Sequence, residues 1–155
     1  MSTTIIALSD THEASLQRLP EALRAALERA DVIVHAGDIT EMTLLQELRA
    51  IKDTIAVAGN MDSTAVKIAL PERHLFTLAG KSVGVVHGSG APSGIDERVR
   101  RLFPENPDLI IFGHSHVPYN GELQGSHMVN PGPGRKSYAT ITVLRDRIET
   151  AIVPL

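Results

Sequence analysis

The sequence contains no cysteine and no tryptophan, and aromatic residues make up only 3% of its 155 residues. Without cysteine, the chain can form neither disulfides nor thiolate metal ligands, and it has no cysteine nucleophile. Histidine and carboxylate side chains therefore remain as its means of holding a metal ion. Because large aromatic side chains are scarce, leucine, isoleucine, valine and alanine must fill the core.

Long apolar runs and a strong positive charge are also missing. The chain has no stretch of about 18 apolar residues, and its first residues lead into a strand-like segment without a basic leader. We therefore expect neither secretion nor membrane insertion, and a cytoplasmic location by default. The formal net charge of −3 argues against a protein that binds nucleic acid as a stable partner. The one dense basic run, residues 98–101, predicts a solvated helix face.

The composition that is present is typical of a folded globular protein. Hydrophobic residues make up 43% of the chain and charged residues 21%. The length fits one hydrophobic core, and the sequence has no internal repeat or linker, so we expect a single domain over residues 1–155. The composition leaves open whether the chain forms a homo-oligomer.

The first third of the chain alternates strand and helix patterns. Residues 4–8 and 32–34 are continuous apolar runs, which are typical of parallel strands buried on both faces. Between them, apolar residues recur at helical spacing, and Pro20 suits the first turn of a helix that runs to about Ala30. A helix at 42–50 and a strand at 54–58 repeat the pattern. Parallel strands joined by helices are predicted.

After Pro71 the pattern changes to antiparallel pairs. Strands at 75–78 and 82–86 flank a hairpin-like turn. A helix at 95–103 and an apolar strand at 109–112 follow, and the chain ends with strands at 128–129, 138–144 and 148–153. Parallel crossovers followed by antiparallel strands predict an α/β fold of two packed mixed sheets flanked by helices.

Five predicted strands end in residues that commonly bind metals, most of them beside glycine. In order along the chain these residues are Asp10 and His12, Asp38, Asn60, His87, and His114 and His116. In open α/β sheets, functional groups collect at the carboxyl ends of the strands, so we expect these side chains to converge. Glycines beside them suit sharp turns or close approach of the backbone.

The ligand types narrow the choice of metal. Two aspartates, one asparagine and four histidines suit Mn²⁺, Fe or Zn²⁺ better than Ca²⁺. Seven ligands are too many for one tetrahedral ion, which takes about four. They suffice for two ions if one carboxylate bridges them.

The ordered pattern D-x-H, G-D, G-N, H-G, G-H-x-H, which spans Asp10 to His116, resembles that of the calcineurin-like metallophosphoesterase superfamily. The chain is most similar to the small single-domain bacterial and archaeal phosphodiesterases, which also carry N-P-G, here residues 130–132. The resemblance implies a four-layer α/β/β/α sandwich of two mixed sheets. It also implies a phosphoesterase, and specifically a phosphodiesterase, that acts on a small phosphoester through attack of a metal-bound hydroxide.

The resemblance implies two divalent transition-metal ions, with Mn²⁺ as the first choice and Fe, Ni²⁺ or Zn²⁺ as alternatives. It assigns two ligand sets and a bridge: Asp10, His12 and His116; Asn60, His87 and His114; and Asp38 between the ions. Catalysis is expected at Asp38, Asn60 and His87. One residue departs from the pattern, because Met61 stands where many relatives have a histidine that is thought to protonate the leaving group.

Other candidates have simpler interpretations. We expect packing or surface roles for His35, His74 and His127, although His35 could also support the ligands. Asp62 is expected to start a turn or cap a helix, and Arg135 to be exposed.

Two other functions compete with hydrolysis of a phosphoester. One branch of the superfamily uses the fold as a non-catalytic scaffold in a membrane-trafficking coat, but that branch departs from the full ligand set, which is intact here. A dinuclear hydrolase of C–N bonds would need carboxylate-rich ligand clusters that the sequence lacks.

Overall fold

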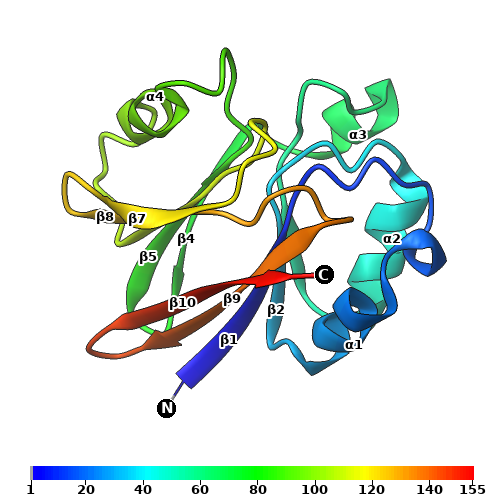
Figure 1. Cartoon of the computed structure of the whole chain (residues 1–155), viewed down its shortest axis with the longest axis horizontal. Coiled ribbons are helices and arrows are strands. Elements are labelled where there is room, and N and C mark those ends of the chain that lie inside the picture. The colour runs from blue at the N-terminus through cyan, green and yellow to red at the C-terminus, as the bar shows by residue number, and fades with distance from the viewer. Residues whose placement is uncertain (1) are drawn as a thin grey trace.

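The computed structural model describes residues 2–155, whose strands form two five-stranded sheets that face each other (Figure 1). The first sheet has the order β10-β9-β1-β2-β3, with β1 Ser2–Leu8, β2 Val32–His35, β3 Thr54–Ala56, β9 Ser137–Leu144 and β10 Ile148–Pro154. The second has the order β4-β5-β6-β8-β7, with β4 Arg73–Leu78, β5 Lys81–Val86, β6 Leu109–Ile111, β7 Tyr119–Leu123 and β8 Ser126–Asn130.

Each sheet combines three parallel strands with antiparallel neighbours. β1, β2 and β3 are parallel in the first sheet, and β5, β6 and β8 are parallel in the second. β9 and β10 extend the first sheet antiparallel, while β4 and β7 form hairpins on the edges of the second. The predicted change from parallel crossovers to antiparallel pairs is confirmed.

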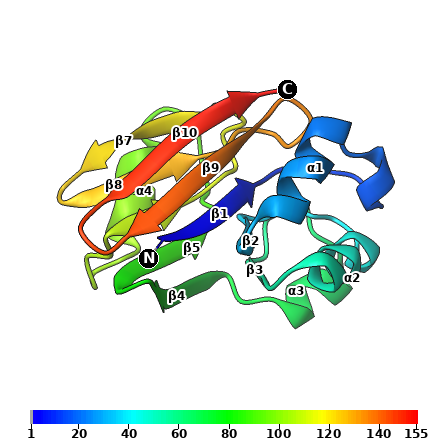
Figure 2. The same ribbon diagram turned by 90° about the horizontal axis from the view of Figure 1, so that it is seen from below.

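Helices cover the outer face of each sheet. The helices α1 Glu21–Arg29, α2 Met42–Ile51 and α3 Thr64–Ala69 lie over the first sheet, and α4 Ile95–Arg101 lies over the second (Figures 1 and 2). A short 3₁₀ turn, Leu16–Arg18, precedes α1. The layers follow the order helix, sheet, sheet, helix, as the resemblance implied.

Three apolar layers hold these elements together. The central layer lies between the sheets and includes Ile5, Val34, Val83 and Ile111, all fully buried. The alternating burial along β9 has the same cause, because every second residue of a strand faces the opposite sheet. Full burial of one such side chain stabilises the fold by about 1.5–3 kcal/mol. Aliphatic residues therefore supply a core that the scarce aromatics do not.

The sequence patterns did not predict two elements, α3 and β7. The helix α3 is six residues long, too short for a clear apolar stripe, and its local signal is Ser63, whose side chain accepts a hydrogen bond from the Val66 N–H at 3.3 Å. Ser63, and not Asp62, caps this helix. The strand β7 has the polar sequence YNGEL, and it is defined by pairing with β8.

The basic run in α4 forms only part of the solvated face that its charges predicted. Arg100 is only 5% exposed, and its guanidinium donates to the carbonyls of Phe103, Leu123 and Gln124. Arg101 is exposed as expected. The prediction is therefore wrong for Arg100. Packing between the end of α4 and the β7–β8 turn removes this side chain from water, and backbone carbonyls there replace water as its acceptors.

Within Ser2–Leu155, the helices are all too short or too polar to cross a membrane.

Candidate metal centre

The residues expected to bind metal all follow parallel strands. Asp10 and His12 follow β1, Asp38 follows β2, and Asn60 follows β3 in the first sheet. In the second sheet, His87 follows β5, and His114 and His116 follow β6. Because parallel strands end at the same edge of a sheet, two facing sheets bring five loops together at one end of the molecule.

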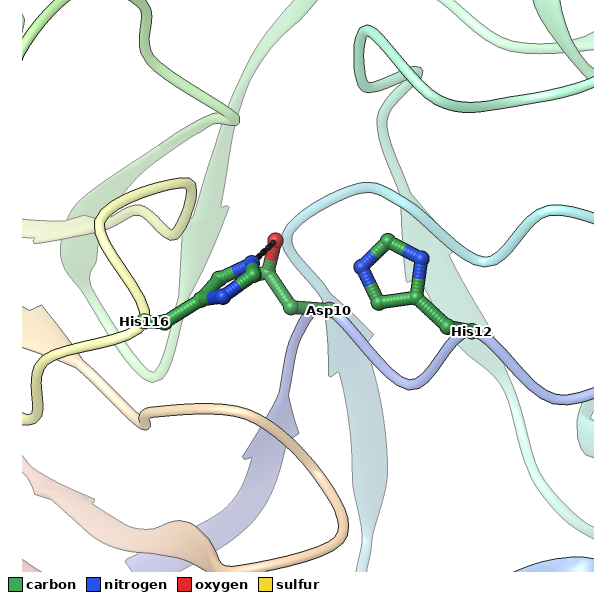
Figure 3. A group of neighbouring side chains, drawn as sticks. All are labelled: Asp10, His12 and His116. Atoms are coloured by element: carbon green, nitrogen blue, oxygen red, sulfur yellow. Dashed lines mark ion pairs between the residues drawn. The ribbon is translucent and has the colours of Figure 1, made fainter.

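Asp10 lies at the centre of the first group of side chains. Figure 3 shows its carboxylate between the rings of His116 and His12. The Oδ1 atom of Asp10 is 3.3 Å from Nε2 of His116. One ligand atom from each of these three residues lies within 4.8 Å of the others. Asp10 is buried, whereas His116 is exposed, so the group opens to solvent on one side.

Asp38 joins this group to the rest of the centre. Its Oδ2 atom is 3.3 Å from Nε2 of His87 and 3.7 Å from Nε2 of His12. Asp10, Asp38 and His87 form a second group with ligand atoms within 4.8 Å of one another, and all three are buried. One carboxylate oxygen therefore faces histidines from two different strands and two different sheets.

Asn60 and His114 complete the set. The Oδ1 atom of Asn60 is 3.1 Å from Nε2 of His87 and 3.2 Å from Nδ1 of His114. The structure thus brings all seven sequence-predicted residues into one continuous cluster. It is deep at the aspartates and open at Asn60 and His116.

Hydrogen bonds to carbonyl oxygens fix two of the imidazole rings. Nδ1 of His87 donates to the Ala36 carbonyl at 2.8 Å, and Nε2 of His114 donates to the Gly90 carbonyl at 3.0 Å. A carbonyl can only accept, so in each neutral ring the other nitrogen presents a lone pair to the cluster. Histidine ligands of metals are usually oriented in this way.

The cluster consequently contains acceptors that face other acceptors. The lone pairs of His87 and His114 are directed at the Asn60 oxygen. Oδ1 of Asp10 and Nε2 of His12 are buried and make no hydrogen bond to any residue in Ser2–Leu155. Buried polar atoms normally have partners. Divalent transition-metal ions fit this cluster, because each of these nitrogen and oxygen atoms is a suitable metal ligand.

The pKa shifts report the same deficit of positive charge. Burial lowers the pKa of His87, but its hydrogen bond to Asp38 and the charges of Asp10 and Asp38 outweigh burial and raise it. Burial raises the pKa of Asp38, yet bonds from His87 and the Met61 N–H, with nearby histidine charge, lower it to about 2. A metal ion at this position would compete with a proton for His87.

Five of the seven residues have a left-handed backbone. Their φ angles lie between 51° and 72°, a range that non-glycine residues rarely adopt; they are Asp10, His12, Asp38, His114 and His116. Each such residue costs about 1–3 kcal/mol and persists only where its surroundings hold it. The backbone of Asp10 is held by a hydrogen bond from its N–H to the Gly37 carbonyl at 3.0 Å.

Glycines allow the loops to approach one another as expected. A side chain at Gly59 would collide with the carboxylate and the backbone nitrogen of Asp38. At Gly37, which has φ of 102°, a side chain would strike the ring of His87. Neither position tolerates a Cβ without displacement of a predicted ligand.

Two buried side chains support the ligand loops. Asn130, from the N-P-G sequence, donates to the Gly113 carbonyl at 3.2 Å and to the Ser115 Oγ at 3.0 Å, which braces the loop of His114. We did not predict this role, although an asparagine directly after an apolar strand was a signal for it.

His35 supports the other side of the centre. The Gly37 N–H donates to Nδ1 of His35, so Nε2 donates to Thr11, between Asp10 and His12. Burial, with the charge of His87, lowers the pKa of His35 to about 3. His35 is therefore buried, and its hydrogen bonds agree with the alternative that it supports the ligand loops. His74, His127 and Arg135 lie outside the cluster, and Arg135 is exposed as expected.

A pocket of about 440 Å³ opens beside Asn60 and His87. Ala58, Val86 and Leu102 supply apolar walls, while Lys67 and Glu72 contribute opposite charges. Its volume lies within the usual range for a small-molecule site.

Comparisons with known proteins indicate one family. A family model described as "Calcineurin-like phosphoesterase superfamily domain" matches residues 3–149. A curated protein of Methanothermobacter thermautotrophicus, named "Probable metallophosphoesterase", is 36% identical over 127 residues, which cover 81% of this chain and 73% of that protein.

Two solved structures share the fold at lower identity. Vps29 from Chaetomium thermophilum is 18% identical, covers 99% of this chain and 97% of its own, and has a TM-score of 0.79. An archaeal phosphodiesterase is also 18% identical, with 98% and 99% covered and a TM-score of 0.72. The family model, the curated relative and the shared fold lead to one conclusion: this chain belongs to the calcineurin-like phosphoesterase superfamily.

Proposed function

We propose that the chain is a phosphoesterase that depends on two divalent metal ions and acts on a phosphodiester. The observation that carries this proposal is the convergence of seven metal-binding side chains, in which Oδ1 of Asp10 and Nε2 of His12 are buried without a hydrogen-bond partner. Membership of the superfamily supports hydrolysis of a phosphoester, and the archaeal phosphodiesterase of the same fold supports the finer assignment.

In this proposal Asp10, His12 and His116 would hold one ion, and Asn60, His87 and His114 would hold the other. Asp38 would be shared by the two, which is supported by the distances of its Oδ2 atom from His12 and His87. When bound, two such ions neutralise charge on phosphoryl oxygens and make a water more acidic. Mn²⁺ is the first choice, and the same ligands accept Fe, Ni²⁺ and Zn²⁺.

Backbone carbonyls orient these ligands, and a pocket beside them can admit the substrate. Ala36 and Gly90 fix the rings of His87 and His114 through their carbonyls, so the ligand nitrogens need no rearrangement. The pocket beside Asn60 offers space for one ester group of the substrate, with Lys67 and Glu72 available to its polar atoms.

The side chain at position 61 shapes the expected substrate preference. Met61 is 60% exposed beside the cluster, and its thioether has no proton to give to a leaving group. General-acid assistance is typically worth about 10²–10⁴-fold for a poor leaving group. We therefore expect a slow enzyme that handles activated aryl phosphodiesters far better than alkyl phosphomonoesters.

The test combines metal analysis with hydrolysis. Metal-free protein is reconstituted with Mn²⁺, the ions bound per chain are counted by elemental analysis, and hydrolysis of bis(p-nitrophenyl) phosphate is compared with that of p-nitrophenyl phosphate and an alkyl phosphate. Two ions per chain and a preference for the diester are expected. One ion or none would contradict the dinuclear centre, and equally fast cleavage of the alkyl monoester would contradict the preference.

A non-catalytic scaffold is the alternative function, and the Vps29 fold makes it worth testing. The two functions differ in a simple way, because a scaffold can bind metal without turnover. Protein with two ions and no hydrolysis of any of the three esters would favour the scaffold. A cytoplasmic location and a single domain stay predictions.

A further inference from the structure

Asp62 lies two residues after Asn60. It is buried, with 6% of its surface exposed. Its Oδ2 atom accepts from the Gly59 N–H at 2.6 Å and from the Asp38 N–H at 3.2 Å, and its Oδ1 atom accepts from the Thr40 N–H at 2.6 Å. Both oxygens are thus engaged by backbone donors, which leaves Asp62 unsuited to protonate a leaving group.

The donors belong to two loops from different strands. Asp38 and Thr40 are in the loop after β2, and Gly59 is in the loop after β3 that carries Asn60. A bond in the reverse direction runs from the Met61 N–H to Oδ1 of Asp38, at 2.8 Å. The two carboxylates therefore tie the loops together reciprocally.

The backbone that Asp62 holds is strained. Asp38 has φ of 58° and Thr40 has φ of 70°, both in the left-handed region. Such conformations persist only when surrounding contacts determine them. Asp62 accepts the N–H of each of these two residues, so it supplies part of the energy that keeps the Asp38 side chain directed at His12 and His87.

We propose that Asp62 is a positioning residue that sets the metal affinity of the centre by fixing Asp38 and Asn60 relative to each other. It touches neither substrate nor ions. The inference rests on the proposed function for the presence of the ions, and on the hydrogen bonds above for the role of Asp62. Groups that orient metal ligands typically contribute about 10–100-fold to metal affinity.

The first test variant is Asp62→Asn, which keeps the shape but replaces one acceptor oxygen with an NH₂ group that faces backbone N–H groups. Asp62→Glu keeps the charge and displaces the carboxylate by one methylene, so it serves if the asparagine variant folds poorly. The matched control is Asp108→Asn. Asp108 also accepts a backbone N–H, from Ser82 at 2.8 Å, but it lies at the opposite ends of β5 and β6.

Each full-length protein is stripped of metal and titrated with Mn²⁺ by calorimetry, and its thermal unfolding is followed without metal. We expect Asp62→Asn to bind Mn²⁺ about 10–100-fold more weakly than the wild type, and Asp62→Glu to show a smaller loss. Asp108→Asn should keep its Mn²⁺ affinity.

The outcomes separate this inference from the proposed function. Wild-type affinity in both Asp62 variants would overturn the role of Asp62 and leave the metal centre intact. An equal loss of affinity in Asp108→Asn would show that the effect is general destabilisation, and it would also overturn the inference. Wild-type protein that binds no Mn²⁺ would refute the proposed function, and the role of Asp62 with it.

Discussion

Two buried polar clusters in this molecule differ in what completes them. At the end of α4, the guanidinium of Arg100 donates to three carbonyl oxygens and to the Asn106 side chain. At the carboxyl ends of the parallel strands, the inward atoms of the predicted ligands face one another as acceptors. The first cluster brings its own cation, and the second does not.

The difference separates a structural cluster from a functional one. The buried Arg100 makes four hydrogen bonds, and removing it would leave its partners unpaired. A cluster of facing acceptors instead destabilises the metal-free protein and gains that energy back when a cation binds. The left-handed backbone at five ligand residues, Asp38 among them, likewise lowers the stability of the fold at the site that is proposed to function.

The largest effect is expected from Asp38→Asn, which removes the charge at the proposed bridge. An amide neither bridges two cations nor balances their charge as a carboxylate does. Loss of several kcal/mol of transition-state stabilisation corresponds to a fall in activity of about 10³-fold. Turnover of an aryl phosphodiester and elemental analysis, with fewer than two ions retained, provide the measurement.

The control for this variant is His74→Ala, on β4 and away from the cluster, which should retain wild-type activity and metal content. The bridging role would be refuted if Asp38→Asn kept both ions and near wild-type turnover.

Arg100→Met tests the other cluster, because it fills a similar volume and leaves the carbonyl acceptors without donors. We expect the free energy of unfolding to fall by about 3 kcal/mol. Urea denaturation measures the loss. Metal stoichiometry should not change, since the Arg100 cluster does not touch the ligands; a loss of bound Mn²⁺ in the folded variant would show that the two clusters are coupled.

His35 gives a pH-dependent link between the fold and the ligand loops. Its pKa is about 3 in the folded protein and 6.5 when unperturbed, so between these values the unfolded state binds the extra proton. The contribution of His35 to the free energy of unfolding is fully present above pH 6.5 and declines as the pH falls toward 3. At pH 4.5 it is lower by roughly 2–3 kcal/mol.

The variant His35→Gln keeps a donor and an acceptor but does not titrate. Urea denaturation of metal-free protein between pH 7 and pH 4.5 should show a flatter stability profile than the wild type, while His74→Gln should keep the wild-type slope. Parallel profiles for wild type and His35→Gln would mean that His35 is not buried as a neutral ring.

The smallest effect is expected from Met61→His, which places a titratable group beside Asn60 at an exposed position. Activity toward alkyl phosphomonoesters should rise by about tenfold, while activity toward the activated aryl diester should change little. The ratio of kcat/KM values for the two substrates measures the change. A uniform change for both substrates would argue against a missing general acid.

Much of this site was readable before the fold was known. Short apolar strands that end in Asp10 or His87 are local patterns, and each ligand type was present at a strand end. Asp62 could not be read in the same way, because its partners include Asp38 and Thr40, more than 20 residues earlier in the chain. Arg100 was misread for a similar reason, since the acceptors that bury it include the β7–β8 turn.

The sequence by itself determined which side chains stand at the ends of the strands, because apolar runs, glycines and polar ligand types are local and hydrophobic patterning decides strand positions. Only the tertiary structure decided which of their atoms face one another and which loops hold them. The acceptor atoms that face one another, the left-handed backbone of the ligand residues and the hydrogen bonds of Asp62 all arise where loops from different strands meet. Contacts between residues far apart in the chain leave no periodic signal in the sequence.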